Sequence, residues 1–279
     1  MAIAFAVTAA VLLGLSDFFA ARSARTTPSV TVTRTAVAVS TVLAPITLLM
    51  VDSEWIAKDT LIAAASGLFM IGGLMLLYRG YSVARMGIVA PLSSVLLAAV
   101  PVLWDAFNGT KPQGPAAAGM ALGVVALVLT SYTPGGQGSV TQGALLGVAS
   151  GVAFGTAFTF MGEVSEQAGL TPVLIQRLVG LTMLTIVFVF RHEPFFARPG
   201  VGRSYAIAAG VPAVFAIAAL QTAFQKGEAG PVAVASSQFA TVAVVLSVVF
   251  NRERMRWWQA IGVASTAAAV ALIAWGGAS

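Results

Sequence analysis

Residues 87–94 read GIVAPLSS, and residues 230–237 repeat five of these eight positions as GPVAVASS. The offset between the two stretches is 143 residues, about half of the 279-residue chain. The same offset pairs Arg34 with Arg177 within otherwise apolar sequence. Arginine is rare in such sequence, so this match carries more weight than matches between alanines or valines. The offset therefore predicts that the chain contains two copies of one structural unit.

The composition indicates the solvent in which these copies fold. Apolar residue types make up 58% of the chain, charged types make up 9%, and the mean hydropathy is +0.91. Soluble domains carry about 25% charged residues, so this chain has too few charges to cover a surface that faces water. The net charge of +5 comes from basic residues spread thinly between apolar runs. This spacing excludes a nucleic-acid-binding patch and is typical of the positive-inside rule of membrane proteins.

Ten apolar runs have about the 20 residues that a membrane-spanning helix needs. Clusters of proline, glycine and charged residues separate them. The connections near residues 80–86 and 225–230 are only a few residues long, so they predict tight helical hairpins. The runs cover residues 3–22, 30–51, 60–79, 87–107, 116–132, 141–162, 172–190, 204–224, 231–250 and 257–275.

The two copies must cross the membrane in opposite directions. Each copy, residues 1–135 and residues 136–279, contains five of the runs. Because five is odd, the second copy enters the membrane from the side opposite to the first. We therefore predict an all-α integral membrane protein with ten transmembrane helices, arranged as two inverted five-helix repeats in one membrane domain. In this architecture a substrate site lies near the midplane between the halves, and access to it alternates between the two sides.

The repeated stretch has the composition of a closely packed helix surface or of a cavity wall. Small residues let helices approach each other, and serines can bond across helices, so both interpretations stay open for the serines. A glutamine in the middle of the bilayer needs polar partners or water, which favours a cavity. Pro91 and Pro101 predict an interruption of the fourth run, and the ninth run lacks these prolines. The candidate lining residues in this stretch and its repeat are Ser93, Ser94, Ser237 and Gln238.

Two charged residues lie at similar depth in the first two runs. Asp17 is about five residues from the end of the first run and Arg34 about five residues into the second, which places both about 7 Å from one surface. They can form an ion pair that holds this hairpin, or one of them can face the cavity and bind a charged substrate group or a proton. Asp17 is the only acid clearly inside a run, so it is the first candidate for proton coupling, and Glu163 is the second. Arg177 repeats Arg34 at the same depth, with Glu163 and Glu166 as its nearest acids.

Aromatic, amide and arginine side chains complete the candidate substrate-binding set. Glutamine and arginine inside apolar runs need partners, and aromatic residues near run ends serve either as interface anchors or as walls of a site. Together with Asp17 and Arg34, the added members are Tyr78, Tyr81, Trp104, Gln176, Arg177 and Gln221.

The sequence contains no constellation typical of an enzyme. It has no cysteine and a single histidine, His192, in a loop. It shows no cluster of acids inside the runs and no histidines at metal-ligand spacing, so we predict neither a metal site nor a catalytic group. The phosphate-binding pattern GxxxxGK[ST] is also absent, which argues against ATP hydrolysis. We therefore expect a protein that is not an enzyme and that needs no cofactor.

Three stretches carry a resemblance to a known family. LLGLSDFFAAR at residues 12–22, LLYRGYSVARMGIVAPLSSVLLAAVP at residues 76–101 and FNRERMRWWQAIG at residues 250–262 resemble the EamA-type branch of the drug/metabolite transporter superfamily. The chain departs from the family at Leu13, where many relatives have tryptophan, and at Thr110, where the counterpart of Glu253 would fall. The resemblance implies a central cavity formed mainly by the first, third, fourth, sixth, eighth and ninth runs, with the fifth and tenth at the periphery.

The resemblance also implies a function. We expect a secondary active transporter that exports or exchanges a small organic metabolite, amino-acid-like or drug-like, by alternating access across the inner membrane of a bacterium, with proton coupling as one option. A channel-like facilitator and a lipid-carrier flippase are the alternatives. The expected partners are the small-molecule substrate and the lipid bilayer, with no nucleic acid, and the oligomeric state stays open.

The two lines of reasoning predict opposite orientations. The connections after the first, third, seventh and ninth runs hold ten arginines, whereas the other side holds only Lys58, Lys111 and Lys226. The positive-inside rule then places the arginine side in the cytoplasm and both termini outside. The family resemblance implies termini inside. The arginines counted are Arg22, Arg25, Arg79, Arg85, Arg191, Arg198, Arg203, Arg252, Arg254 and Arg256.

Overall fold

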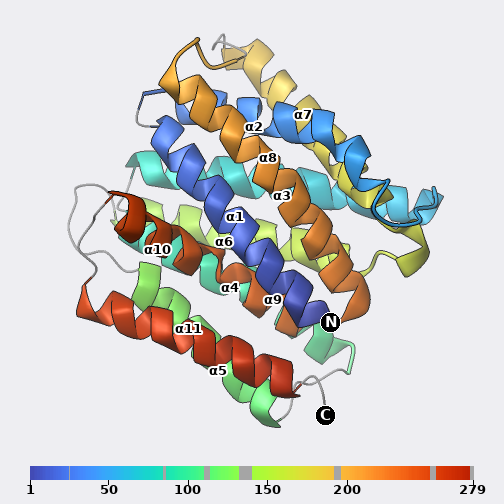
Figure 1. The fold of residues 1–279 in the computed structure, drawn as a ribbon, viewed down its shortest axis with the longest axis vertical. Coiled ribbons are helices and arrows are strands. Elements are labelled where there is room, and N and C mark those ends of the chain that lie inside the picture. The colour runs from blue at the N-terminus through green and yellow to red at the C-terminus, as the bar shows by residue number, and fades with distance from the viewer. Residues whose placement is uncertain are drawn as a thin grey trace.

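The computed structural model describes residues 1–24, 26–83, 86–109, 114–131, 140–191, 196–251 and 256–276, and every regular element within these ranges is a helix (Figure 1). This confirms the predicted all-α class for the described residues. In chain order the elements are α1 (Ala2–Ala24), α2 (Ser29–Thr47), α3 (Ala57–Val83), α4 (Met86–Phe107), α5 (Gly114–Ser131), α6 (Val140–Gly162), the 3-10 turn η1 (Glu166–Ala168), α7 (Thr171–Arg191), α8 (Val201–Lys226), α9 (Ala229–Ser237), α10 (Phe239–Asn251) and α11 (Trp257–Gly276).

The helices follow the ten predicted runs, and the ninth run contains two of them. Within the described residues, six helices are long and apolar enough to cross a membrane, namely α1, α2, α3, α6, α7 and α8. Shorter apolar segments lie in α4, α5 and α11. The connections from α3 to α4 and from α8 to α9 are short, in agreement with the predicted hairpins. Ten crossings in two inverted repeats stay a prediction.

The break in the helices lies in the ninth run rather than in the fourth. The predicted interruption at Pro91 and Pro101 is wrong, because α4 continues through both prolines. The ninth run instead divides into α9 and α10 at Gln238, whose ψ angle of 0° lies outside the α-helical range.

Side chains at the end of α9 explain this break. Ser236 Oγ donates a hydrogen bond of 3.2 Å to the carbonyl of Ala233, and Ser237 Oγ donates one of 2.8 Å to the carbonyl of Val234. Gln238 Nε2 donates to the same Val234 carbonyl at 3.2 Å. Such bonds compete with the helical backbone for its carbonyl groups and bend or end helices. Three competing donors in succession therefore interrupt the helix at this point.

The helices end on two faces with different charges. The acidic face collects the ends of α2, α4, α6 and α8 with the starts of α3, α5, α7 and α9, and Ser53 Oγ there accepts a hydrogen bond of 3.0 Å from the backbone N–H of Leu170. The arginine face collects the opposite helix ends, and Ser23 Oγ there donates a bond of 2.7 Å to the carbonyl of Gly202. The described carboxylates of the acidic face are Asp52, Glu54, Asp59, Asp105, Glu163, Glu166 and Glu228. The described arginines of the arginine face are Arg22, Arg79, Arg198, Arg203 and Arg256.

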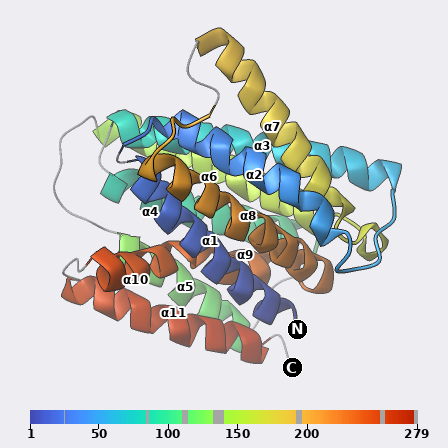
Figure 2. The same cartoon turned by 45° about the horizontal axis from the view of Figure 1, so that its top comes forward.

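The most extensive contacts of α1 and of α3 join one half of the chain to the other (Figures 1 and 2). α1 packs mainly on α8, and α3 packs mainly on α6. With the 143-residue offset, α1 corresponds to α6 and α3 corresponds to α8. The packed pair α1 and α8 is therefore the counterpart of the packed pair α6 and α3. By the same offset, the packing of α2 on α8 is the counterpart of the packing of α7 on α3. The counterparts α5 and α11 lie side by side at one edge, as the resemblance implied for the fifth and tenth spans (Figure 2).

Glycines let α6 approach α4 closely. Gly147, Gly151 and Gly155 lie four residues apart on α6 and face α4. A Cβ atom at Gly151 would lie 2.6 Å from the carbonyl oxygen of Ser93, and one at Gly155 would lie 2.6 Å from Cβ of Val100. These distances leave no room for a side chain, so the contact requires glycine.

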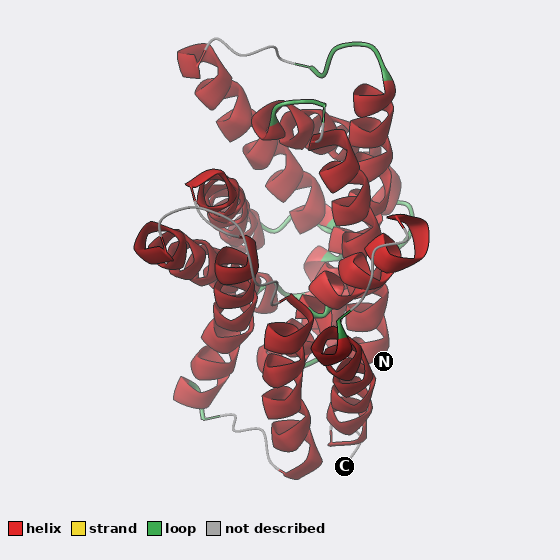
Figure 3. Cartoon of the chain, turned by 90° about the vertical axis from the view of Figure 1, so that its left-hand side faces the viewer, coloured by secondary structure: helices red, strands yellow, loops and turns green. Residues whose placement is uncertain are grey.

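The largest apolar cluster fills the half of the molecule next to the acidic face. Its buried members in α1, α2, α4, α6, α7 and α8 each lie closer to the acidic end of their helix than to the opposite end. Figure 3 shows the described segments as helices joined by short loops, so helix packing provides the interior. Members of this cluster include Ala6 and Ala9 of α1, Phe158 and Met161 of α6, Leu220 and Phe224 of α8, and Val232 and Ala233 of α9.

Candidate functional site

Two neighbouring residues at the end of α4 contact two different helices of the second half. Trp104 Nε1 donates a hydrogen bond of 2.7 Å to Oε1 of Glu163, which directly follows α6. The next residue, Asp105, accepts a hydrogen bond of 2.5 Å at Oδ2 from the backbone N–H of Gly230 in the first turn of α9. The end of α4 is therefore bonded to both α6 and α9 at the acidic face.

A cavity of about 390 Å³ lies beside the bond between Trp104 and Glu163, between α4 and α6. Aliphatic and aromatic side chains form most of its walls, and Glu163 provides a carboxylate. Such a lining suits a molecule that has an apolar body and a hydrogen-bond donor or a positive charge. The cavity is lined by Val100, Leu103, Trp104, Phe107, Thr156, Thr159, Phe160 and Glu163.

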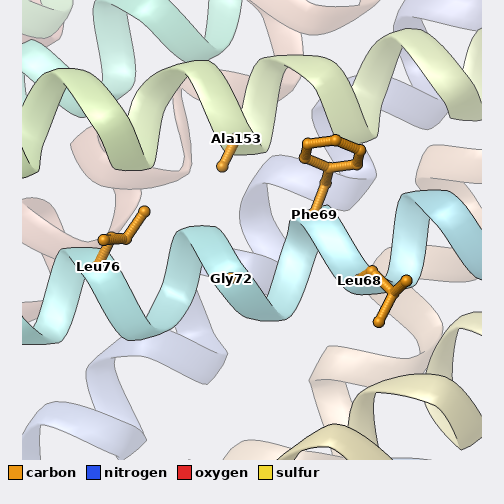
Figure 4. A pocket seen from close by; sticks show the side chains of 5 residues that line it. All are labelled: Leu68, Phe69, Gly72, Leu76 and Ala153. Atoms are coloured by element: carbon orange, nitrogen blue, oxygen red, sulfur yellow. The ribbon is translucent and has the colours of Figure 1, made fainter.

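A second cavity, of about 370 Å³, contains none of the predicted site residues (Figure 4). It is lined by Leu68, Phe69, Gly72 and Leu76 of α3 and Ala153 of α6. Phe69 and Leu76 point toward α6, and Gly72 leaves space opposite Ala153 (Figure 4). Since every lining residue is apolar, this cavity offers no side-chain hydrogen bond and no charge.

Asp17 and Arg34 do not form the predicted ion pair within the described part of the chain. Asp17 on α1 is exposed, whereas Arg34 on α2 is completely buried, and its guanidinium carbon lies 4.6 Å from the ring centre of Phe188 on α7. The reason is that α1 and α2 both pack mainly on α8 rather than on each other. Similar depth in the membrane therefore does not bring the two charges together.

Gln176 and Arg177 contact different helices from adjacent positions on α7. Gln176 Nε2 donates a hydrogen bond of 3.3 Å to Ser66 Oγ of α3, and this hydroxyl donates to a backbone carbonyl of α6. Arg177 Nη2 donates to the carbonyl of Ala213 on α8 at 3.5 Å. Glu163, predicted as an acid near Arg177, contacts α4 instead. These two residues therefore connect α7 to its neighbours.

The serines of the repeated stretch make bonds that favour helix packing. Ser93 and Ser94 are buried on α4, and Ser93 Oγ accepts a hydrogen bond of 2.8 Å from Ser150 Oγ on α6. Ser237 is also buried and donates to a carbonyl of its own helix. The sequence left helix packing and cavity lining open for these serines, and their contacts match helix packing.

Gln221 and Gln238, which are both buried, differ in how fully they are bonded. Gln238 Nε2 donates to the carbonyl of Gly123 on α5 at 3.4 Å, and its Oε1 accepts from Thr266 Oγ1 on α11 at 3.1 Å. Gln238 thus contacts the peripheral pair α5 and α11. Gln221 Nε2 donates to the carbonyl of Met161 on α6 at 3.1 Å, while its Oε1 accepts no hydrogen bond from the described residues. Gln221 therefore keeps a free acceptor between α8 and α6.

Some predicted residues cannot be placed in this way. The side chains of Tyr78 and Tyr81 lie outside the described residues, as does His192. Their roles stay predictions. Among the residues that the structure describes, no group of three histidine, cysteine, aspartate or glutamate side chains could hold a metal ion.

Asp105 is the residue that sequence reasoning missed. Asp17 was expected to be the only acid clearly inside a run, but Asp105 also lies within a helix, in the last turn of α4. Its position near the end of the run indicated an ordinary boundary residue. The signal that could have found it is an acid directly beside Trp104, at the membrane surface where Gly230 precedes the ninth run.

The EamA-like transporter family model matches residues 141–275, which extend from α6 to α11. The second half of the chain is therefore similar to the EamA-like transporter family. The family is part of the drug/metabolite transporter superfamily, so the resemblance of the sequence is confirmed. EamA members are transporters rather than enzymes, and this EamA-like chain is a multi-pass membrane protein of the drug/metabolite transporter kind.

A solved structure shares the fold of this EamA-like chain along its whole length. It is described only as "Crystal structure of protein", and it matches with a TM-score of 0.82 and 18% sequence identity over 99% of this chain and 97% of that chain. At this identity the likeness shows the fold alone. It includes the first half, which the family model does not match. No curated protein matches the sequence.

Proposed function

We propose that this EamA-like protein is a secondary active transporter that exports or exchanges a small organic metabolite, amino-acid-like or drug-like, across the cytoplasmic membrane of a bacterium. Residues 1–135 and residues 136–279 act as two inverted five-helix repeats, and the substrate site lies between them. Rocking of one repeat against the other exposes the site to either side in turn. The observation that carries this proposal is the exchange of helix partners between the two halves.

The directions of the helices support the inverted relation. α1 runs from the acidic face to the arginine face, whereas its counterpart α6 runs from the arginine face to the acidic face. The packing of α1 on α8 recurs as the packing of α6 on α3, and α6 runs in the direction opposite to α1. Two units related in this way enclose one shared space rather than two separate ones.

The free polar atoms favour a solute with polar groups as well as an apolar body. In the described part of the chain, Gln221 keeps a buried acceptor atom without a hydrogen-bond donor, and Asp17 exposes a carboxylate within α1. Trp104 adds an aromatic wall to the cavity between α4 and α6. We assign these three residues to the substrate pathway, together with Tyr78 and Tyr81. The other members of the predicted set, Arg34, Ser93, Ser94, Gln176, Arg177, Ser237 and Gln238, support the walls through their helix contacts.

Asp17 is the proposed proton-coupling residue. It is exposed within α1, a helix long and apolar enough to span a membrane. A carboxylate at such a position requires water, a partner or a proton, which makes it a functional candidate. Glu163 is the second candidate, but its bond to Trp104 gives it a separate task at the acidic face.

Flux measurements in proteoliposomes test this function. A thermal-shift screen of amino acids, nucleobases and cationic drugs first identifies a ligand, because a ligand that binds the folded state raises its stability. We then expect saturable counterflow of that ligand and accumulation driven by a pH gradient. Asp17→Asn should abolish the driven accumulation but retain counterflow, while Glu163→Gln should retain the driven accumulation.

Three outcomes would contradict parts of the proposal. Flux that does not saturate would indicate a channel-like facilitator, and movement of labelled lipid without solute counterflow would indicate a flippase. Full driven accumulation by Asp17→Asn would remove Asp17 from the coupling step.

The charges of the two faces also support an orientation. We propose that the arginine face lies in the cytoplasm, because arginine-rich connections stay on that side of a membrane. Both termini then lie outside, since α1 starts and α11 ends at the acidic face. A fluorescent protein fused to the C-terminus should stay dark in the periplasm. Bright fluorescence would reverse this orientation.

A further inference from the structure

We propose that Asp105 closes the acidic face by clamping α9 to α4, and that release of this clamp opens the face. The inference rests on the proposed alternating access and adds a residue that controls it. The clamp consists of the bond from the Gly230 N–H to Asp105 Oδ2, with the bond from Trp104 to Glu163 one residue away. Asp105 is a positioning residue here, because it acts through the place of α9 rather than on the substrate.

The local geometry suits a clamp that can open. A carboxylate next to the first turn of a helix is stabilised by the helix dipole and by free backbone N–H groups. A Cβ atom at Gly230 would lie 3.1 Å from both Asp105 Oδ2 and Val102 Cγ2, so glycine permits this close approach. α9 has nine residues and is separated from α10 by the break at Gln238. The break provides a hinge about which α9 can move, while α10 stays packed on α1 and α5.

The repeat does not carry the clamp residues to the other face. By the 143-residue offset, the counterparts of Trp104 and Asp105 are Ser247 and Val248, and the counterpart of Glu163 is Ala20. A valine side chain cannot accept a hydrogen bond from a helix N-terminus, and an alanine cannot accept one from a hydroxyl. The repeat therefore does not reproduce these two bonds at the arginine face. A device present on one side of a two-sided transporter is suited to hold that side closed.

The burial of α1 agrees with a structure closed at the acidic face. Ala6, Ala10, Asp17 and Ala21 share one side of this helix. Ala6 and Ala10, toward the acidic face, are 0% and 3% exposed. Asp17 and Ala21, toward the arginine face, are exposed. The largest apolar cluster lies in the same acidic half.

Single-cysteine labelling tests the clamp directly, because the chain has no cysteine of its own. One probe is Ala233→Cys, at a fully buried position of α9 behind the clamp. The other is Ala21→Cys, at an exposed position of α1 toward the arginine face. Each probe is combined with Asp105→Ala, with Asp105→Asn, and with Val248→Ala as the counterpart control. The labelling rate is measured with a membrane-impermeant maleimide in proteoliposomes permeabilised so that both faces are reachable.

We expect the two probes to respond in opposite directions. Loss of a hydrogen bond to a charged acceptor should raise the labelling of Ala233→Cys about tenfold or more, and labelling of Ala21→Cys should fall as the other face closes. Asp105→Asn retains an acceptor oxygen and should restore protection of Ala233→Cys. Val248→Ala should change neither probe.

A purely structural role of Asp105 would give a different result. If Asp105→Ala only loosened the fold, both probes would label faster together, and this outcome would overturn the clamp. Unchanged labelling of both probes would overturn it as well. A different result would refute the proposed function. If the two probes responded in opposite directions but no solute flux were measured, the clamp would be supported and transport would be refuted.

Discussion

The fourth and ninth runs start from nearly the same residues and adopt different structures. α4 is one continuous helix through two prolines, whereas α9 and α10 are divided at Gln238. By the repeat offset, the counterpart of Gln238 in α4 is Val95, which has no polar group to compete for backbone carbonyls. Ser93 bonds across to Ser150 on α6, but its counterpart Ser236 bonds back to its own helix.

This difference teaches that neighbouring helices decide what a repeated sequence does. The glycines of α6 bring a whole helix against α4, so Ser93 finds a partner there and the prolines are held in a helical path. The break in the ninth run has partners on α5 and α11 that satisfy Gln238. Similar stretches can therefore supply a rigid helix in one half and a hinge in the other.

The largest effect is expected for Gly151→Leu, which disrupts the close contact between α6 and α4. The added side chain would meet the backbone of Ser93, and overpacking of this kind costs about 3 kcal/mol or more where a backbone cannot move. Thermal unfolding in detergent should show a loss of cooperative folding or a large fall in midpoint temperature. The counterpart Thr8 is exposed, so Thr8→Leu should leave the midpoint nearly unchanged. Equal midpoints for the two variants would mean that α4 and α6 do not pack as described.

An intermediate effect is expected for Gln238→Val, which gives the ninth run the residue of the fourth. Loss of the bonds to Gly123 and Thr266 should cost about 1–2 kcal/mol in the free energy of unfolding. With the competing side chain removed, backbone amides after residue 238 should exchange their hydrogens more slowly. Val95→Gln is the reverse swap and should leave α4 continuous. Faster exchange in Gln238→Val would show that the glutamine is not the cause of the break.

The smallest effect is expected from the serines. A double-mutant cycle of Ser93→Ala and Ser150→Ala should give a coupling energy of about 1 kcal/mol, the contribution of one buried hydrogen bond. Ser236→Ala should change stability by less than about 0.5 kcal/mol, since its bond only competes with the helix. Chemical denaturation of the four cycle members and of the single variant measures both numbers. Zero coupling between Ser93 and Ser150 would remove the contrast between the two stretches.

Much of the fold could be predicted from the sequence, whereas the contacts of the site could not. The apolar runs gave the helices because run length and hydropathy are properties of the chain alone. The proline rule failed at Pro91, since a helix packed along its length tolerates a missing hydrogen bond. The pairing of Asp17 with Arg34 failed because α8 is the main partner of both α1 and α2, and no local pattern reports which helix lies next to which.

The order of residues alone predicted an α-helical chain that folds in lipid, two copies of one structural unit, and a resemblance to one transporter family. These follow from composition, periodicity and an offset, which need no knowledge of distance. Packing decided which side chains meet: Trp104 reaches Glu163 across 59 positions, and Asp105 reaches Gly230 across 125. Helical periodicity can assign a residue to a face of its helix, but only the three-dimensional arrangement of helices brings that face against a particular partner.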